Sequence, residues 1–162
     1  GTGTDRSADA LAVAQDNAAR LGLAGRAVFA LADWHQPGWA DSLGGPFDLV
    51  LANPPYVEDD ADLAPSVRVH EPAGALFAGA EGLDDYRVLV PQLPGLLAPG
   101  GVALVEIGHA QADAVTALAA QAGMEATLHR DLGGRARVLE LRVPGMQGLE
   151  RKIPLGKGTA TA

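Results

Sequence analysis

Residues 47–56 read FDLVLANPPY, a short apolar run that ends abruptly in an amide side chain, two prolines and a phenol. The apolar run shows no polar alternation, which is typical of a parallel strand covered on both faces by helices. Pro54 and Pro55 then fix φ and have no N–H groups to donate. The Asn53 side chain beside them can both accept and donate hydrogen bonds. The sequence therefore predicts a buried strand that ends in a rigid polar turn at a sheet edge.

The composition is that of one ordinary globular domain. The chain has 162 residues, of which 48% are hydrophobic and 20% charged, enough to bury a core. No apolar run approaches the roughly 20 residues that span a bilayer, and the first residues do not resemble a secretion signal. The absence of cysteine excludes disulfides and thiolate metal sites. We therefore expect no membrane association and a cytoplasmic location.

The charge and the histidines exclude two classes of site. The net charge is −8, whereas a nucleic-acid binder needs a basic surface that displaces counterions, so we expect no direct nucleic-acid binding. The four histidines (His35, His70, His109 and His129) show no paired spacing typical of metal ligands. We therefore predict no metal site.

Strand and helix signals alternate along the chain. Ser7 is a plausible N-cap, and the helix that follows ends at Gly22, a natural C′ residue. Residues 27–32 read as a short buried strand, and residues 83–97 as a helix that its prolines must kink or divide. A strand at 102–107, a helix at 110–122, and strands at 125–130 and 137–143 follow. From residue 145 onward the composition predicts a disordered tail.

This alternation predicts an α/β domain with a mostly parallel sheet. The last two strands have too short a connection for a parallel crossover, so they must pair antiparallel. In such sheets ligands bind outside the carboxyl ends of the strands. Four polar residues fall at such ends: Asp5, Asp33, Asn53 and Glu106.

Together these motifs resemble a known family. The chain is similar to the Rossmann-like S-adenosylmethionine-dependent methyltransferases, whose sheet ends in an antiparallel hairpin strand. More narrowly, it resembles the protein-glutamine N5-methyltransferases of the PrmC/HemK family, which modify the glutamine of the Gly-Gly-Gln loop in peptide chain release factors. Besides Asn53-Pro54-Pro55-Tyr56, the matching stretches are Asp5-Arg6-Ser7, Ala10-Leu11, Asn17-Ala18, Asp33-Trp34, Glu71-Pro72, Gly82-Leu83-Asp84, Pro99-Gly100-Gly101, Glu106-Ile107-Gly108 and Asp131-Leu132-Gly133-Gly134-Arg135.

The chain departs from the family pattern at its N-terminus. Family members begin with a small helical domain, and then carry a Gly-x-Gly-x-Gly loop roughly 20 residues before the acid that binds ribose. Here Asp5 directly follows Gly1-Thr2-Gly3-Thr4. Either the intervening strand and helix are deleted or residues 1–4 end the second strand, and we favour the second interpretation. Both predict an N-terminally truncated chain that lacks a core strand, with a partial catalytic domain at 1–144 and a tail at 145–162.

The resemblance implies roles for the site residues. Asn53 and the Pro54 carbonyl would accept the two hydrogens of the substrate amide, within a turn that Pro55 makes rigid. Tyr56 would pack against the glutamine. S-adenosylmethionine would be held by Asp5 at the ribose hydroxyls, by Asp33 at the adenine amino group, by Trp34 against adenine, and by Asn53. Glu106 is expected to anchor loops and not to act as a general base.

Other interpretations remain open from the residues alone. Asp5 could be a plain turn acid, Trp34 could fill the core, and the proline turn could be structural. The function predicted first is methylation of release factors. The alternatives are a nucleic-acid amino-methyltransferase, which should have a basic groove, and a catalytically impaired fragment or non-catalytic binding module. Since the glycine loop is incomplete, we expect weak cofactor binding by the chain alone.

Overall fold

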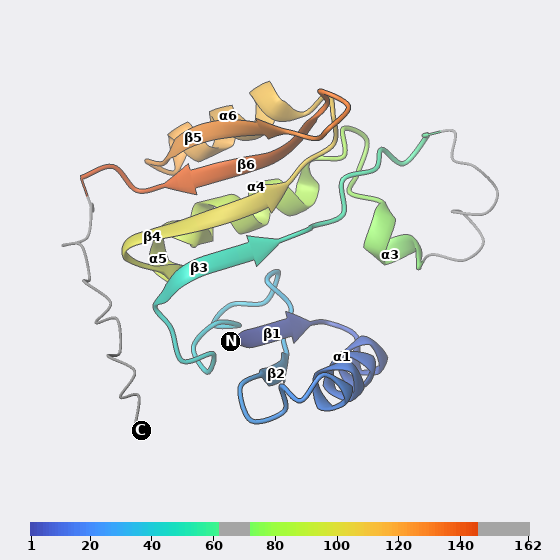
Figure 1. Ribbon diagram of the computed structural model, residues 1–162. Coiled ribbons are helices and arrows are strands. Elements are labelled where there is room, and N and C mark those ends of the chain that lie inside the picture. The colour runs from blue at the N-terminus through green and yellow to red at the C-terminus, as the bar shows by residue number, and fades with distance from the viewer. Residues whose placement is uncertain (62–71, 146–162) are drawn as a thin grey trace, which may run out of the picture.

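The computed structural model describes residues 1–61 and 72–145, so the predicted tail beyond Gly145 and the Glu71 motif lie outside the described residues. The described chain forms two β-sheets with helices packed on them (Figure 1). None of the described helices is long and apolar enough to cross a membrane. The predicted α/β class is confirmed, but the strands are divided between two sheets.

The smaller sheet is built by the first residues of the chain. Strand β1 (Thr2–Asp5) pairs in parallel with β2 (Val28–Leu31), and α1 (Ala8–Arg20) connects them. The helix begins where predicted, because the Ser7 side chain accepts a hydrogen bond from the Ala10 amide, and it is followed by Gly22 at φ +70°. Residues 2–4 are thus strand, as the favoured interpretation of the N-terminus requires, and not a glycine loop.

The larger sheet has four strands in the order β3-β4-β6-β5. Strand β3 (Phe47–Ala52) pairs in parallel with β4 (Leu97–Glu106), whereas β6 (Ala136–Arg142) is antiparallel to both β4 and β5 (Glu125–Arg130). The predicted antiparallel end of the sheet is therefore confirmed. Residues 99–101 form a bulge within β4, since Leu97 pairs with Phe47 and Val102 already pairs with Leu49.

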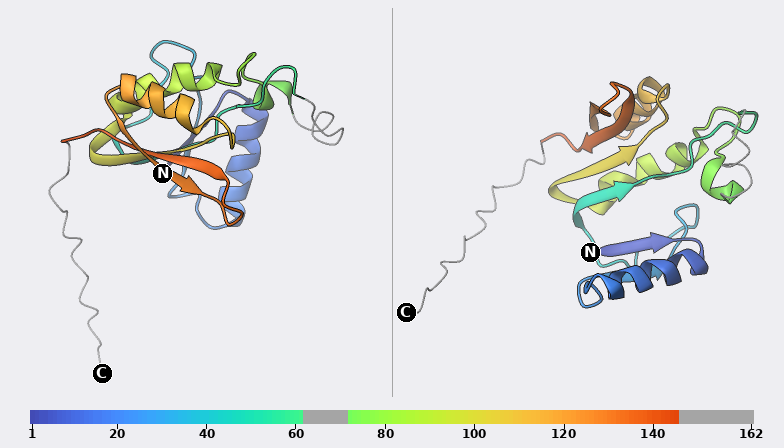
Figure 2. Two further views of the ribbon diagram at one scale, coloured as in Figure 1. Left: turned by 90° about the horizontal axis from the view of Figure 1, so that it is seen from above. Right: turned by 45° about the vertical axis from the view of Figure 1, so that its right-hand side comes forward.

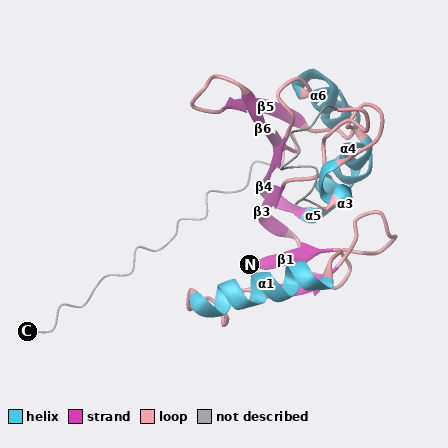
Figure 3. Ribbon diagram, turned by 90° about the vertical axis from the view of Figure 1, so that its right-hand side faces the viewer, coloured by secondary structure: helices cyan, strands magenta, loops and turns pink. Residues whose placement is uncertain are grey.

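The helices of the second half of the chain cover one face of the larger sheet (Figures 2 and 3). They are α4 (Asp84–Leu89), the 3₁₀ turn η1 (Val90–Gln92), α5 (Leu93–Leu96) and α6 (Ala112–Gln121), and the short α3 (Ala73–Leu76) precedes them. Of the two outcomes expected for residues 83–97, a kink or a division, the structure shows the division. The core lies between these helices and the sheet, where Tyr86, Leu93, Val105, Ile107 and Leu139 are almost fully buried.

The prediction that residues 49–52 are covered on both faces is wrong. Val50 and Ala52 pack against the core, but Leu49 and Leu51 point the other way and are 51% and 69% exposed. The reason is that no described helix lies over this face of β3 (Figure 3). Strand β2 is also less buried than predicted, because Val28 and Leu31 at its ends are exposed.

One edge of β3 is unpaired within the described residues, and so is one edge of β1. The two strands lie side by side with this unpaired edge of each facing the other (Figures 1 and 2). A cavity lined by residues of both strands separates them. The carboxyl ends of β1, β2, β3 and β4 consequently gather on the same side of the molecule, which places the candidate site.

Candidate functional site

The polar turn lies at the carboxyl end of β3, where the sequence places it. Asn53 is exposed, Pro54 is fully buried, and Pro55 and Tyr56 are half-buried. The Tyr56 hydroxyl donates to Glu106 Oε1 over 3.3 Å, which links the turn to the end of β4. Because the proline rings fix the backbone between them, the turn holds Asn53 at the sheet edge while its prolines pack inward.

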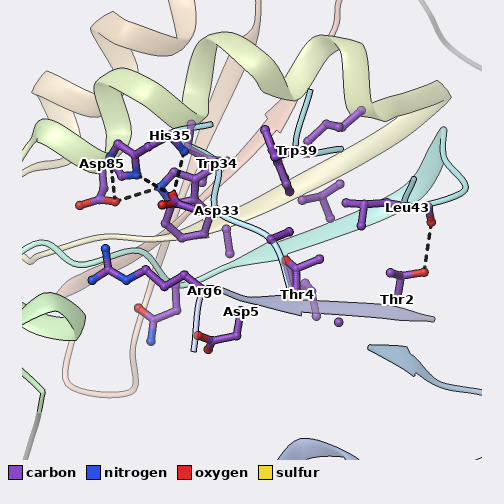
Figure 4. Close-up of a pocket in the computed structure, with 18 of the residues that line it drawn as sticks. Thr2, Thr4, Asp5, Arg6, Asp33, Trp34, His35, Trp39, Leu43 and Asp85 are labelled. Atoms are coloured by element: carbon purple, nitrogen blue, oxygen red, sulfur yellow. Dashed lines mark hydrogen bonds and ion pairs between the residues drawn. The ribbon is translucent and has the colours of Figure 1, made fainter. Parts of the chain in front are cut away.

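A cavity of about 530 Å³ connects this turn with the ends of β1 and β2. Five of the predicted site residues line it: Asp5, Asp33, Trp34, Asn53 and Pro55. Figure 4 shows Asp5 on one side of the cavity and Asp33 with Trp34 on another. Pro54 and Tyr56 are outside the lining. The structure thus brings together all the residues predicted for the cofactor, although they come from three separate strands.

Asp5 ends β1 and also organises the start of α1. Its Oδ1 accepts a hydrogen bond from the Ser7 amide over 2.7 Å, and its side chain is exposed beside the cavity. Asp5 therefore acts as a turn residue, which is one of the two interpretations that the sequence left open. The turn occupies one oxygen of the Asp5 carboxylate, and the second oxygen can accept hydrogen bonds from a ligand.

Asp33 follows β2 and forms a tight turn with His35. Its Oδ1 accepts from the His35 amide over 2.9 Å and lies 3.0 Å from His35 Nδ1. The hydrogen bond from the His35 amide is the main reason why the pKa of Asp33 lies below its ordinary value, although partial burial opposes it. Asp33 is therefore a stable anion at the cavity edge.

Trp34 lies both against the core and at the cavity. Its indole Nε1 donates to Asp85 Oδ1 over 2.9 Å, and its carbonyl accepts from Gln92 Nε2 over 3.0 Å. Its ring packs against the core cluster while the residue also lines the cavity. The two interpretations of Trp34 are therefore compatible, because one face of the ring can be supported by protein while the rest is available to a ligand.

Behind the turn, two tyrosines surround Glu106. Tyr86 donates its hydroxyl to the Glu106 carbonyl over 3.0 Å, and Tyr56 donates to the Glu106 side chain. Burial raises the pKa of both tyrosines, and the Glu106 carboxylate adds to the increase at Tyr56. Both phenols are consequently held in their neutral form, and Glu106 joins β4 to the turn.

Sequence comparison identifies close relatives. The release factor glutamine methyltransferase of Rhodospirillum rubrum is 45% identical over 145 residues, which are 88% of this chain and 43% of that protein. The enzyme of the same name from Cereibacter sphaeroides is 45% identical over 147 residues, 89% of this chain and 51% of that protein. This chain belongs to the release factor glutamine methyltransferase family. It spans about half the length of the curated relatives it matches. No protein-family model matches it.

Solved structures support the fold of this family. A ribosomal protein L11 methylase from Lactobacillus delbrueckii subsp. bulgaricus superposes with a TM-score of 0.59 at 21% identity, covering 88% of this chain and 56% of that chain. A putative methyltransferase from Thermoplasma acidophilum superposes with a TM-score of 0.57 at 16% identity, covering 90% of this chain and 58% of that chain. At these identities the likeness concerns the fold alone, and it confirms the predicted methyltransferase-like α/β architecture.

Sequence reasoning missed several residues that support the site. Asp85, Gln92 and Gln111 hold loops that carry site residues, and His35 supports Asp33. Asp85 directly follows the Gly82-Leu83-Asp84 motif, and Gln111 lies three residues after Glu106-Ile107-Gly108. Closeness to a family motif is therefore the sequence feature that could have pointed to these two residues. Among the described residues, no group of three His, Cys, Asp or Glu side chains could hold a metal ion.

Proposed function

We propose that this chain carries the methyl-transfer site of an S-adenosylmethionine-dependent enzyme that methylates N5 of the glutamine in the Gly-Gly-Gln motif of peptide chain release factors. The observation that carries the proposal is the cavity that joins Asn53 to Asp5, Asp33 and Trp34. The names of the relatives favour this function over a nucleic-acid amino-methyltransferase or a non-catalytic binding module.

The residues around the cavity fit a nucleoside that carries a positive charge. The carboxylates of Asp5 and Asp33 can accept hydrogen bonds from ribose hydroxyls and from the adenine amino group, and both favour a cation nearby. The Trp34 ring, fixed at its Nε1 by Asp85, offers a flat apolar surface to adenine. When bound, S-adenosylmethionine supplies a methyl group on a sulfonium, which a nucleophile can attack.

Asn53 acts on the substrate amide. An amide nitrogen is a poor nucleophile because its lone pair is delocalised, so its orientation must supply much of the rate. Asn53 Oδ1 accepts one amide hydrogen and favours the positive charge that develops on nitrogen as the N–C bond forms and the C–S bond breaks. The nitrogen then loses a proton to solvent. The Pro54 carbonyl is assigned the second hydrogen, and since Pro54 is buried, this oxygen must become accessible when substrate enters.

The experiment measures transfer of labelled methyl from S-adenosylmethionine to a release factor and to a peptide that contains Gly-Gly-Gln. It uses this chain and a version preceded by the upstream half of the Rhodospirillum rubrum relative. We expect Asn53→Ala to reduce the transfer rate at least about 100-fold, because it removes a contact that acts in the transition state. The dissociation constant for S-adenosylmethionine, measured by calorimetry, should change less than about threefold.

The matched control is Asn17→Ala, which changes an exposed asparagine on α1 away from the cavity and should leave transfer unchanged. A second control replaces the glutamine of the peptide with alanine, which should abolish labelling. Transfer that survives in Asn53→Ala would disprove the role of Asn53. Failure of both versions to label a release factor would disprove the proposed function.

A further inference from the structure

Gln111 connects three loops at the carboxyl ends of the central strands. It precedes α6, and its side chain turns back toward β4, where Oε1 accepts a hydrogen bond from the Gly108 amide over 3.0 Å. Its Nε2 donates to the Tyr56 carbonyl over 3.0 Å and to the Gly82 carbonyl over 3.1 Å, with a longer contact of 3.4 Å to the Glu81 carbonyl. We call this set of contacts the Gln111 bridge.

The chemistry of the partners requires an amide at this position. The three partners of Nε2 are backbone carbonyl oxygens, which accept, and the partner of Oε1 is a backbone N–H, which donates. Only a side chain with both an acceptor and two donors satisfies this set. A glutamate of the same shape would keep the bond from Gly108 but would place a negatively charged oxygen against the carbonyls of Tyr56 and Gly82.

Two glycines allow the backbone to close around this side chain. A Cβ added at Gly108 would lie 2.6 Å from Gln111 Oε1. A Cβ added at Gly82 would lie 2.7 Å from Gln111 Nε2 and would also collide with the Tyr56 carbonyl oxygen. Gly82 moreover has φ +64°, a conformation that glycine adopts readily. The absence of side chains at Gly82 and Gly108 therefore leaves the space that the Gln111 side chain occupies.

The bridge acts on the turn that carries Asn53. Tyr56 lies three residues beyond Asn53, and the two residues between them are prolines with fixed φ. Holding the Tyr56 carbonyl consequently restricts the orientation of Asn53 as well. On the basis of the proposed function, we propose that Gln111 is a positioning residue: it sets the orientation of the Asn53-Pro54-Pro55-Tyr56 turn for methyl transfer without touching cofactor or substrate.

The test compares Gln111→Glu and Gln111→Ala with the wild type. A matched control is Gln121→Glu, which adds the same charge at an exposed position at the end of the same helix. We expect both Gln111 variants to lower kcat for methyl transfer at least about tenfold, because a small displacement of a reacting group has a large effect on rate. The KM for S-adenosylmethionine should stay within about twofold, because Gln111 is outside the cavity lining.

The rates are divided by the number of cofactor sites measured by calorimetry, so that a loss of folded protein does not imitate a loss of positioning. A kcat per site in Gln111→Glu equal to that of Gln121→Glu would overturn the proposal. A parallel loss of kcat and cofactor affinity would also overturn it, since it would indicate a general structural role.

A second measurement separates this proposal from the proposed function. If the wild type transfers no methyl group, the proposed function fails, and hydrogen exchange of the Gly108 amide then tests the bridge itself. We expect exchange at Gly108 to rise at least about tenfold in Gln111→Ala, because its acceptor is removed, and to be unchanged in Gln121→Glu. Unchanged exchange in Gln111→Ala would overturn the bridge.

Discussion

The indole Nε1 of Trp34 donates a hydrogen bond to Asp85 Oδ1 over 2.9 Å, and this bond fixes the loop after β2 against α4. Asp85 is only 7% exposed and is the buried charged residue of the described core. His35 Nε2 lies 3.7 Å from the same oxygen. The side chain that orients the candidate adenine surface is therefore held by a carboxylate that sequence reasoning did not single out.

This bond predicts a difference between two substitutions of Asp85. Asp85→Ala should lower the free energy of unfolding by about 1–3 kcal/mol, because the Trp34 N–H loses its acceptor in a partly buried position. Asp85→Asn keeps an acceptor oxygen and should cost less. Denaturant unfolding measures both, with Asp16→Ala on exposed α1 as the control. Equal stability of Asp85→Ala and the control would contradict this prediction.

The two tyrosines of the chain give a prediction at alkaline pH. Because burial raises the pKa of Tyr56 and Tyr86, the folded protein should show no tyrosinate absorbance step at the ordinary value near about 10. Because the folded pKa is raised, the stabilisation is complete below the ordinary value of about 10 and is lost as the pH rises from there through the raised folded pKa.

Glu106→Gln provides the matched variant for this titration. It removes the negative charge that adds to the pKa increase at Tyr56, so the pKa of Tyr56 should fall while Tyr86 remains neutral through burial. Absorbance of tyrosinate measured against pH follows both groups, and unfolding in denaturant should return them to the ordinary value. A step near about 10 in the folded wild type would show that the phenols are not protected.

Much of the fold was predictable because local signals and topology agreed. The Ser7 cap, the prolines within residues 83–97 and the short connection between β5 and β6 each leave few structural alternatives. The burial of β3 was predicted wrongly, because the absence of polar alternation indicated two covered faces, whereas only the face with Val50 and Ala52 packs against the core. Leu49 and Leu51 show that the second covering layer is a property of distant packing, not of the strand sequence.

The residues of the candidate site likewise include some that could be predicted from the sequence and some that could not. Asp5, Asp33 and Asn53 could be found because strand ends in α/β sheets gather on one side, and Trp34 could be found through the family resemblance. Asp85 and Gln111 could not, since their roles depend on which loop each side chain reaches across the fold. A buried hydrogen bond between segments distant in sequence leaves no periodic pattern to read.

Asp33 gives a prediction at acidic pH. Its folded pKa is lowered, chiefly by the His35 amide, so its contribution to stability is present above the ordinary value of about 3.9 and is lost as the pH falls below it. Asp33→Asn keeps an oxygen for the His35 amide but cannot titrate. We expect this variant to lose less stability than the wild type between neutral and acidic pH, as measured by thermal unfolding.

The effect of Asp33→Asn should be partial. The pKa values of Asp131 and Glu140 are also lowered, by the Arg135 amide and by Arg142 respectively, so both contribute to acid unfolding in the variant. An acid dependence identical to that of the wild type would show that the Asp33–His35 turn does not favour the charged carboxylate.

The uncovered face of β3 predicts self-association of this chain. Exposed apolar side chains such as Leu49 and Leu51 can be buried against a second copy, and a lysine on this face opposes that contact. Since Leu51 is 69% exposed, Leu51→Lys should change the free energy of unfolding by less than about 0.5 kcal/mol. Light scattering against concentration should show less association than in the wild type. Unchanged association, or unfolding of the variant, would contradict the role of this face of β3.

Gly82 and Gly134 separate the effect of backbone conformation from that of a collision. Both have positive φ, at +64° and +79°, but a Cβ at Gly134 would meet nothing within 4 Å, whereas one at Gly82 would strike the Tyr56 backbone. Gly134→Ala should therefore cost only the strain of about 1–2 kcal/mol expected for a left-handed residue with a side chain. Gly82→Ala adds displacement of Tyr56, so it should cost more in denaturant unfolding and should also increase hydrogen exchange at Gly108. Equal costs for the two variants would show that the turn yields to the added methyl group, and that close packing around Gln111 does not hold Tyr56 in place.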